Sequence, residues 1–351
     1  MLKVLAFTRY ANLGASSRLR FYQYISAIKL YNIEIDPSPL FNENYIDFLY
    51  LGKGRSFRII ITSYIKRIIK LFSVARYDLV IIEKELFPYL PGVFESLLYL
   101  FNKRHIVDYD DAVFHLYDQS NNFYVKFLAK KIDLIMRRSD LVICGNEYIY
   151  DRAKAVKSKR VELLPTVVDT EKYHTAPLKK SKTIIIGWIG NPSTVHCLEL
   201  VRDPLNILSE RFEIVLNVIG AQFNSDVFKV NCIKWEEDTE VKNIQEIDIG
   251  IMPLHDGPFE KGKCGYKLIQ YMACGKPVVA SPVGVNKKIV RESNSGCLAI
   301  TEKDWIDELS KLCDSTALRE KYGSDAIVYI EKYYSMKVTL PIFANLLNTL
   351  E

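Results

Sequence analysis

The stretch GKCGYKLIQYMACGKPVVASPVG, residues 262–284, decides the fold of the second half of this chain. It begins with glycines and lysines, continues as a segment that is apolar on one side, and ends in Cys-Gly-Lys-Pro and the short run VVAS. This order predicts a loop, a helix and a strand, and the preceding IDIGIMPL at 247–254 predicts a buried strand before the loop. Strand, loop and helix in this order form one unit of a parallel α/β sheet.

The same alternation continues in both directions along the chain. Further β-branched runs are KVLAFT at 3–8, DLVIIE at 78–83, HIVDYDD at 105–111, LVICGN at 141–146, TIIIGWIG at 183–190 and EIVLNVIG at 213–220. The pattern lapses where prolines, polar residues and lysines accumulate. We therefore predict an α/β protein with two doubly wound domains, 1–165 and 183–330, a linker at 166–182, and a C-terminal helix at 331–351 that packs back on the first domain.

The overall charge is mildly basic. Lys and Arg number 47 against 42 Asp and Glu, a net charge of +5 in 351 residues. This excess suits an anionic ligand or an anionic membrane surface, or is simply a solvated basic surface, and it falls short of the footprint of a nucleic-acid binder. We expect no nucleic-acid partner.

The cysteines and the apolar runs indicate the compartment. The seven cysteines lack any C-x-x-C or Cys/His ligand spacing, which predicts neither a disulfide framework nor a zinc site. The N-terminus does not resemble a signal peptide, and no apolar run reaches the ~18 residues that a membrane span needs. We expect a cytoplasmic protein whose membrane contact, if it has one, is peripheral.

Two lysines mark the expected helix start in the opening stretch. Lys263 and Lys267 lie among glycines, whereas a purely structural helix start favours acidic residues. Free backbone N–H groups at a helix start, together with these lysines, would bind a diphosphate. The alternative is that both lysines simply face solvent.

The sequence QYMACGKPVVAS resembles the donor-binding segment of retaining family 4 glycosyltransferases of the GT-B fold, also called glycosyl transferases group 1, whose usual form is E-x7-E within EGFGLPxLEAMACGxPVV. The resemblance implies two Rossmann-like domains facing a central cleft, with loop amides, here around Cys264 and Gly265, on the donor diphosphate. Gln270 occupies the position of the second Glu, which holds the ribose, and Gly262 that of the first. The sugar contact therefore passes to Asp256 or Glu260.

A second segment extends the resemblance. GWIGNPSTVHCLEL at 187–200 is similar to the first strand and helix of the family's C-terminal domain, although the usual Arg and Lys are absent. The resemblance implies that backbone and hydroxyl donors of the loop contact the diphosphate, and these are Gly190, Asn191, Ser193 and Thr194. The alternative is a plain turn in which Ser193 caps a helix.

The first half offers the acidic candidates. VDYDDAVF at 107–114 resembles a branch of these enzymes with a D-x-D-D-A motif, which implies that Asp110 and Asp111 face the donor sugar as catalytic residues, unless they serve only as helix caps. Gly14, Arg18 and Arg20 follow the first strand, where arginines near a helix start indicate an anionic phosphate or acceptor partner. Because the GT-B fold typically works without a bound metal, we expect no metal and no cofactor besides the nucleotide sugar itself.

Residues 55–76, RSFRIIITSYIKRIIKLFSVAR, interleave six basic side chains with large apolar ones. This pattern is typical of a basic amphipathic helix on an anionic leaflet, or of a surface helix with its apolar side in the core.

Together these features predict a retaining glycosyltransferase that moves a hexose from a nucleotide diphosphate sugar to a hydroxyl of a glycan or glycolipid acceptor. Other interpretations stay open on the same fold. One is a sugar-nucleotide epimerase or a glycan phosphorylase. Another is a non-catalytic nucleotide-sugar binder, which the missing E-x7-E carboxylates would permit.

Overall fold

The structure is a computed structural model that describes residues 1–43, 45, 57–95, 97–101, 103–176 and 181–350. The chain forms two compact units. The first contains Met1–Thr166, Gly262–Cys264 and Thr339–Glu351, and the second contains Val167–Lys261 and Gly265–Val338. Of the predicted linker, Val167 to Ala176 therefore belong to the second unit, and residues 177–180 lie outside the described residues.

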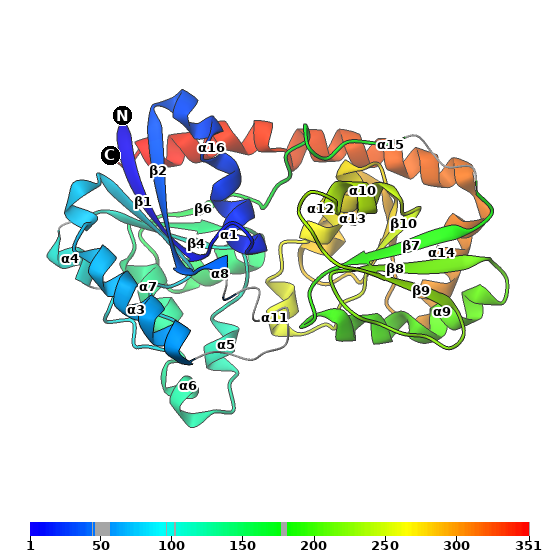
Figure 1. Ribbon diagram of the computed structural model, residues 1–351, viewed down its shortest axis with the longest axis horizontal. Helices are drawn as coiled ribbons and strands as arrows, with labels where there is room; N and C mark the ends of the chain where they lie inside the picture. Colours follow the sequence, from blue (N-terminus) through cyan, green and yellow to red (C-terminus); the bar gives the residue numbers. More distant parts are fainter. Residues whose placement is uncertain (44, 46–56, 96, 102, 177–180, 351) are drawn as a thin grey trace. The chain divides into compact units, whose positions relative to one another are not determined.

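The first unit is built on a six-stranded parallel sheet with the order β2-β1-β3-β4-β5-β6 (Figure 1). Its strands are β1 (Leu2–Tyr10), β2 (Ile33–Phe41), β3 (Leu79–Glu83), β4 (His105–Tyr109), β5 (Leu141–Cys144) and β6 (Val161–Leu163). Its helices are α1 (Ala15–Arg20), η1 (Tyr22–Tyr24), η2 (Ala27–Tyr31), α3 (Phe57–Leu71), η3 (Val74–Arg76), α4 (Leu97–Leu100), α5 (His115–Asp118), α6 (Phe123–Phe127), α7 (Lys131–Arg138) and α8 (Glu147–Ala155).

The second unit repeats this architecture with the order β12-β11-β10-β7-β8-β9, again all parallel (Figure 1). Its strands are β7 (Ile184–Ile189), β8 (Ile214–Ile219), β9 (Lys229–Ile233), β10 (Ile249–Met252), β11 (Val278–Ala280) and β12 (Gly296–Leu298). Its helices are η4 (Val195–Val201), α9 (Arg202–Ser209), α10 (Glu240–Gln245), α11 (Pro258–Lys261), α12 (Tyr266–Ala273), α13 (Val285–Ser293), α14 (Glu302–Asp314) and α15 (Thr316–Tyr333).

The central strands are mostly apolar because helices cover both faces of each sheet. In β3 the three residues Val80, Ile81 and Ile82 are fully buried, and in the second unit Trp188 of β7 is among the largest fully buried side chains. The predicted fold class, two doubly wound α/β domains, is confirmed. Among the described residues, no helix has the length and apolar character needed to cross a membrane.

The last helix, α16 (Met336–Asn348), lies mainly in the first unit. The hydroxyl of Thr339 lies 2.8 Å from the hydroxyl of Tyr24. The ring of Phe343 packs against the Tyr24 ring with centroids 5.2 Å apart. The C-terminal end of the chain is thus part of the N-terminal unit's core.

A buried ion pair links α1 to the centre of the first sheet. The guanidinium of Arg20 donates two hydrogen bonds to the carboxylate of Asp108, at 2.8 and 2.6 Å, and a third to the carbonyl of Leu164 at 2.8 Å. Both side chains are almost fully buried. Burial is tolerable here because each charge has a partner with good geometry.

We predict that Asp108→Asn lowers the free energy of unfolding by about 3–5 kcal/mol, because it leaves the buried Arg20 charge without a counter-charge. Glu162→Gln is the matched control, since its pair with Arg160 is only partly buried and should contribute less than about 1 kcal/mol. Urea unfolding measures both variants. Equal stabilities of the two variants would contradict this role of the buried pair.

Candidate functional site

Ligands of open parallel sheets bind beyond the carboxyl ends of the strands, where the strand order reverses. In the first unit this edge follows β1 and β3, and in the second it follows β7 and β10. The two edges are described in turn.

A buried lysine, Lys84, is the centre of the first edge. It follows β3 directly and its backbone has φ of +63°, a left-handed conformation that non-glycine residues seldom adopt. Its ammonium nitrogen lies 2.8 Å from Asp110 and 3.4 Å from Asp111, which follow the neighbouring strand β4. The two predicted acidic residues therefore share one lysine, which sequence reasoning did not select.

Hydroxyl groups of α1 complete this cluster. Ser16 donates to Asp110 at 2.5 Å and lies 2.9 Å from the carboxylate of Glu83, the last residue of β3. Ser17 donates to the other oxygen of Glu83 at 2.6 Å, and the backbone N–H of Arg9 donates to it at 2.7 Å. Three carboxylates are thus held at one strand edge by one ammonium group, two hydroxyls and one amide.

The surroundings shift the pKa values of two of these carboxyl groups in opposite directions. Burial opposes ionisation of Asp110, but Lys84 and the hydrogen bonds outweigh it, so the pKa of Asp110 is lowered. At Glu83 burial dominates, and the pKa is raised. Burial likewise opposes the charge of Lys84, but its carboxylate neighbours, Asp110 first, raise the pKa of this lysine. At neutral pH the pair Lys84 and Asp110 is therefore ionised.

The other first-unit candidates have structural partners. Gly14 precedes α1, and a Cβ atom there would lie 2.3 Å from that of Tyr10. Arg18 is buried with a nitrogen 3.4 Å from the Asn12 carbonyl, and Arg20 forms the buried pair with Asp108 described above. The sequence predicted that Arg20 contacts a phosphate or the acceptor. In the structure its guanidinium is buried in the ion pair with Asp108 instead.

The segment Gly262–Cys264, from the stretch that opened the sequence analysis, belongs to the first unit. The side-chain amide of Asn146 donates to the Gly262 carbonyl at 2.7 Å. The Cys264 thiol donates to the Asp110 carbonyl at 2.9 Å, and burial raises the pKa of this thiol to about 12. Cys264 is thus neutral at physiological pH, and its thiol holds this segment beside the backbone of Asp110. Lys263, between Gly262 and Cys264 in the sequence, is half-buried.

In the second unit, the loop after β7 is an Asx turn. The side-chain oxygen of Asn191 accepts hydrogen bonds from the backbone N–H and hydroxyl of Ser193, at 3.1 and 2.6 Å. The Asn191 carbonyl accepts from the backbone N–H of Thr194 at 3.0 Å. Ser193 therefore stabilises the turn, and η4, which begins after Thr194, has no side-chain cap.

Lys267 on α12 reaches this turn. Its ammonium lies 3.8 Å from the ring centroid of Trp188 in β7, and a Cβ atom on Gly190 would come within 2.7 Å of the same ammonium. Gly190 is needed because no side chain fits between the indole and the lysine. The structure thus brings Lys267 beside Gly190 at the carboxyl end of β7, with its ammonium against the face of the Trp188 ring.

Gln270, expected at the donor ribose, is buried in a polar network of the second unit. Its amide donates to the hydroxyl of Tyr173 at 3.0 Å. That hydroxyl and the indole N–H of Trp235 both donate to the carboxylate of Glu240. The amide of Gln270 is therefore engaged with the protein, and Trp235, which follows β9, is the network's partly exposed end.

The two alternatives for the sugar contact lie near α11. Asp256 is exposed and forms an ion pair of 3.3 Å with Lys261. Glu260 is half-buried on α11 itself. Gly265, at the start of α12, has φ of +66°, and a Cβ atom there would meet Ile289 at 2.8 Å.

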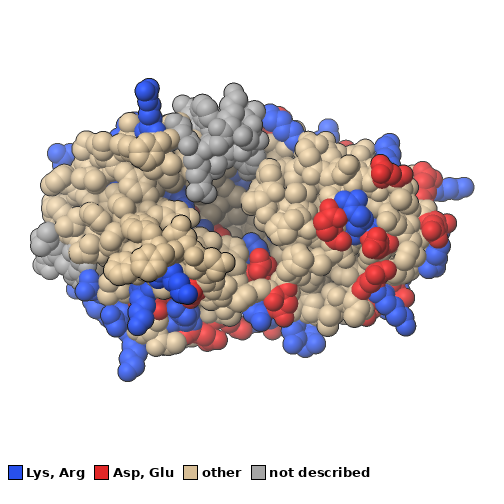
Figure 2. Space-filling view, turned by 90° about the horizontal axis from the view of Figure 1, so that it is seen from below, with Lys and Arg blue, Asp and Glu red and all other residues tan. Residues whose placement is uncertain are grey.

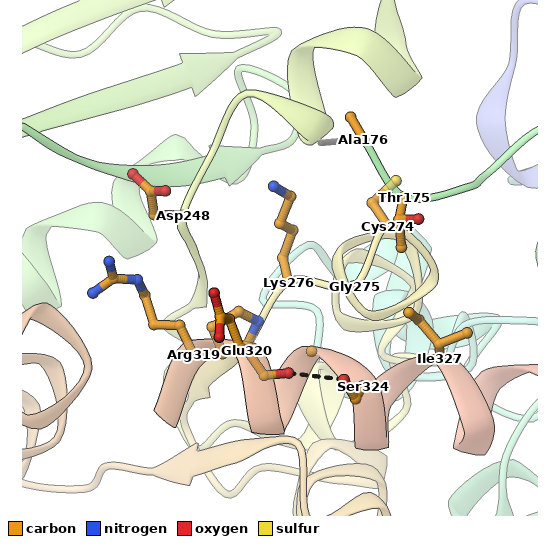
Figure 3. A pocket seen from close by; sticks show the side chains of 12 residues that line it. Thr175, Ala176, Asp248, Cys274, Gly275, Lys276, Arg319, Glu320, Ser324 and Ile327 are labelled. Carbon is orange, nitrogen blue, oxygen red and sulfur yellow. Dashed lines mark hydrogen bonds between the residues drawn. The ribbon is translucent and has the colours of Figure 1, made fainter. Parts of the chain in front are cut away.

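A pocket of the second unit lies away from these residues (Figure 3). Asp248 and Lys276, which come just before β10 and β11, line it together with Arg319 and Glu320 of α15. It therefore opens at the amino ends of the strands, the edge opposite to that expected for a nucleotide. We do not assign the donor to it.

The stretch 55–76 forms α3 from Phe57 and presents much of its apolar side to solvent; Arg55 lies outside the described residues. Phe57, Ile69 and Phe72 are 74%, 63% and 73% exposed. Arg67, one of the six basic residues of this stretch, is instead 2% exposed and donates to the carbonyls of Thr8 and Ser38, so it is not placed to contact an anionic leaflet.

The helix α6 adds to this apolar surface. Its Phe123 and Phe127 are 88% and 79% exposed. Tyr64 of α3 donates to the carbonyl of Pro88, and Tyr124 of α6 donates to that of Tyr89. Both helices therefore contact the loop that follows β3. We call the exposed apolar residues of α3 and α6 the apolar surface. In Figure 2 the left-hand part, the first unit, shows a broad uncharged area with Lys and Arg along its border.

Solved structures with the same fold were found by comparison with known proteins. Over 100% of this chain and 99% of the other, the structure matches sucrose-phosphate synthase from Thermosynechococcus elongatus with a TM-score of 0.74 and 12% identity. HepE of Anabaena, solved in complex with UDP-glucose, matches over 99% of this chain and 100% of its own, with a TM-score of 0.71 and 13% identity. The protein has the GT-B fold of these structures.

The sequence comparison is consistent with this fold. Residues 183–315, which lie in the second unit, match the family described as "Glycosyl transferases group 1". A relative from Bacillus subtilis (strain 168), TuaH, named for a glycosyltransferase of teichuronic acid biosynthesis, is 24% identical over 174 residues. That match covers 44% of this chain and 43% of TuaH.

The sequence contains only a weak signal for Lys84. It lies in EKE directly after a buried strand, a position that faces the ligand edge of a parallel sheet. Position alone did not distinguish it from the neighbouring glutamates, because only the contact with Asp110 gives the lysine a role.

We predict that Lys84→Met destabilises the protein more at pH 7 than at pH 3. With its lowered pKa, ionised Asp110 contributes stability that is present above the ordinary carboxyl pKa of about 3.9 and lost as the pH falls through the lowered value. Without Lys84, burial dominates and the ionised carboxylate becomes unfavourable.

Urea unfolding at the two pH values measures this difference. Lys321→Met, at an exposed position of α15, is the control and should change stability equally at both. The same loss for Lys84→Met at pH 3 and pH 7 would contradict the coupling to Asp110.

Proposed function

We propose that this protein is a retaining glycosyltransferase that transfers a hexose from a nucleotide diphosphate sugar to an acceptor hydroxyl in cell-surface glycan assembly. The observation that carries the proposal is the match of residues 183–315 to glycosyl transferases group 1 within a chain of GT-B fold. The matched range includes the turn after β7 and the start of α12, where Gly190 and Lys267 meet. The kinship with TuaH supports a polysaccharide or glycolipid acceptor.

In this proposal the second unit holds the donor. The diphosphate lies at the start of α12, where Lys267 supplies charge and the backbone N–H of Gly265 supplies a hydrogen bond. Lys263, a few residues before Lys267 in the sequence, is proposed as a second source of positive charge. The nucleoside lies toward the network of Gln270 and Trp235.

The acidic pair of the first unit acts on the reacting sugar. Lys84 and Ser16 hold Asp110 in place, so Asp110 acts by positioning Asp111. Asp111 is half-exposed and can accept a hydrogen bond from a hydroxyl of the donor sugar. An oxygen of the departing diphosphate takes the acceptor proton on the same face, while lysines and amides stabilise the charge that develops on the diphosphate. Donors that are held in place before the reaction need little reorganisation when this charge develops.

The apolar surface supports a lipid-linked acceptor. Neither α3 nor α6 contains an acidic residue, and exposed basic side chains accompany the aromatic ones, namely Arg58, Lys66 and Lys126. Apolar groups that enter the headgroup region, with cations that contact anionic lipid, are the features of a peripheral membrane site. We propose that this surface holds the protein on an anionic leaflet at the cytoplasmic face of the membrane.

The test of activity is incubation with a panel of nucleotide sugars that includes UDP-glucose, the ligand found in HepE. We expect Asp111→Asn to lose transfer while it keeps donor affinity and melting temperature, and Lys263→Ala with Lys267→Ala to weaken donor binding by about 1–3 kcal/mol. Calorimetry and product analysis measure these effects.

Lys303→Ala, at an exposed site of α14, is the control and should bind the donor normally. Binding without turnover by the unaltered protein would favour the non-catalytic binder, and unchanged affinity in the lysine variants would remove them from the donor site.

For the membrane site we predict that vesicles containing phosphatidylglycerol bind the protein, and that added salt weakens the binding. Lys66→Glu should weaken it by about 2 kcal/mol, since each nearby charge contributes about 1 kcal/mol. Phe123→Ser with Phe127→Ser should weaken it further by removing apolar groups. Vesicle sedimentation measures each variant.

Ile300→Ser, which removes an equally exposed apolar side chain from the second unit, is the matched control. Wild-type affinity in the two-phenylalanine variant would show that the apolar surface does not contact lipid.

A further inference from the structure

Two histidines and a cysteine of the second unit meet at the carboxyl edge of its sheet. They are His196 and Cys197, at the start of η4, and His255, which follows β10. One ligand atom from each lies within 4.8 Å of the other two. The imidazole rings of His196 and His255 are parallel within 9°, with centroids 5.8 Å apart.

The strand order explains why these residues meet. Numbering runs outward from β7 in one direction and from β10 in the other, so the order reverses between these two neighbouring strands. The chain leaves β7 toward His196 and leaves β10 toward His255, and the two exits flank the crevice in which such sheets bind ligands. The cluster therefore lies at the switch point of the donor-binding unit.

The geometry and the atom types suit zinc. Zinc bonds of about 2.0–2.1 Å to nitrogen and about 2.3 Å to sulfur, at a tetrahedral angle, place the two ligand atoms about 3.6 Å apart. The Nε2 atom of His196 lies 3.7 Å from the Cys197 sulfur. Imidazole and thiolate ligands favour zinc, whereas magnesium and calcium favour oxygen.

We propose that His196, Cys197 and His255 bind one zinc ion. Cys197 is buried and fixes the ion against the sheet, while both histidines are exposed side chains that can turn to close the site. Binding converts the Cys197 thiol to a thiolate and releases its proton to solvent. The absence of a spaced Cys/His motif predicted no zinc site, but His255 lies far from the other two in sequence and reaches them only through the fold.

Three protein ligands leave a fourth tetrahedral position for water or another oxygen ligand. If the proposed donor function holds, a phosphate oxygen of the nucleotide is the natural occupant, because the Gly190 turn precedes His196 by a few residues. The zinc site itself does not depend on that function.

The test is titration of the nucleotide-free protein with zinc by calorimetry, together with the absorption spectrum of the cobalt-substituted protein. We expect one ion per chain and a thiolate-to-cobalt charge-transfer band. Cys197→Ser should abolish the band, and His255→Ala should weaken zinc binding by more than the roughly 10–100-fold that loss of an outer-shell partner costs.

His174→Ala and Cys232→Ser are the matched controls, since both residues are exposed, lie in the same unit and are not in the cluster. Because His255 is exposed, its variant should keep the fold even if Cys197→Ser does not. No stoichiometric zinc, or equal affinity in His255→Ala and His174→Ala, would overturn the site. Either result would leave the transferase proposal intact, and failure to bind nucleotide sugars would leave the zinc site intact.

Discussion

The candidate site depends on one constraint, which is that parallel strands all end at the same edge of their sheet. Residues that are far apart in the chain, such as Lys84 and Asp110, become neighbours because each directly follows one of two adjacent strands. The same rule brings His196 and His255 together in the second unit. In both units the candidate residues therefore lie at the carboxyl edge of the sheet, at or next to the point where the strand order reverses.

Burial of charge is the cost of this arrangement in the first unit. Arg20 with Asp108 and Lys84 with Asp110 are ion pairs almost fully removed from water. Such pairs contribute little net stability compared with apolar residues of similar size, but losing either partner is severe. Pairs of this kind fix the carboxylates before any ligand arrives, as an electrostatically preorganised site requires.

On the outer surface of the first unit, an arginine is buried while large apolar side chains are exposed. The helix α3 buries an arginine, Arg67, and exposes Phe57 and Ile69, which reverses the usual partition of polar and apolar side chains. Arg67 is stabilised by two backbone carbonyls and lies 4.9 Å from the ring centroid of Phe7. The exposed apolar side chains have no such compensation within the described part of the unit, and a lipid surface would supply it.

The sequence alone determined the α/β class, the division into two sheets and the strand-end positions of Asp110, Asp111 and Gly190, because strand periodicity and turn residues are local signals. It could not determine which of these residues share a partner. Arg20 was expected at a ligand and instead pairs with Asp108, since helix position does not say which neighbour a long side chain reaches. Lys84 and His255 meet their partners only because those residues follow neighbouring strands. Those pairings are decided by strand order, a property of the packed sheet that no short stretch of sequence contains.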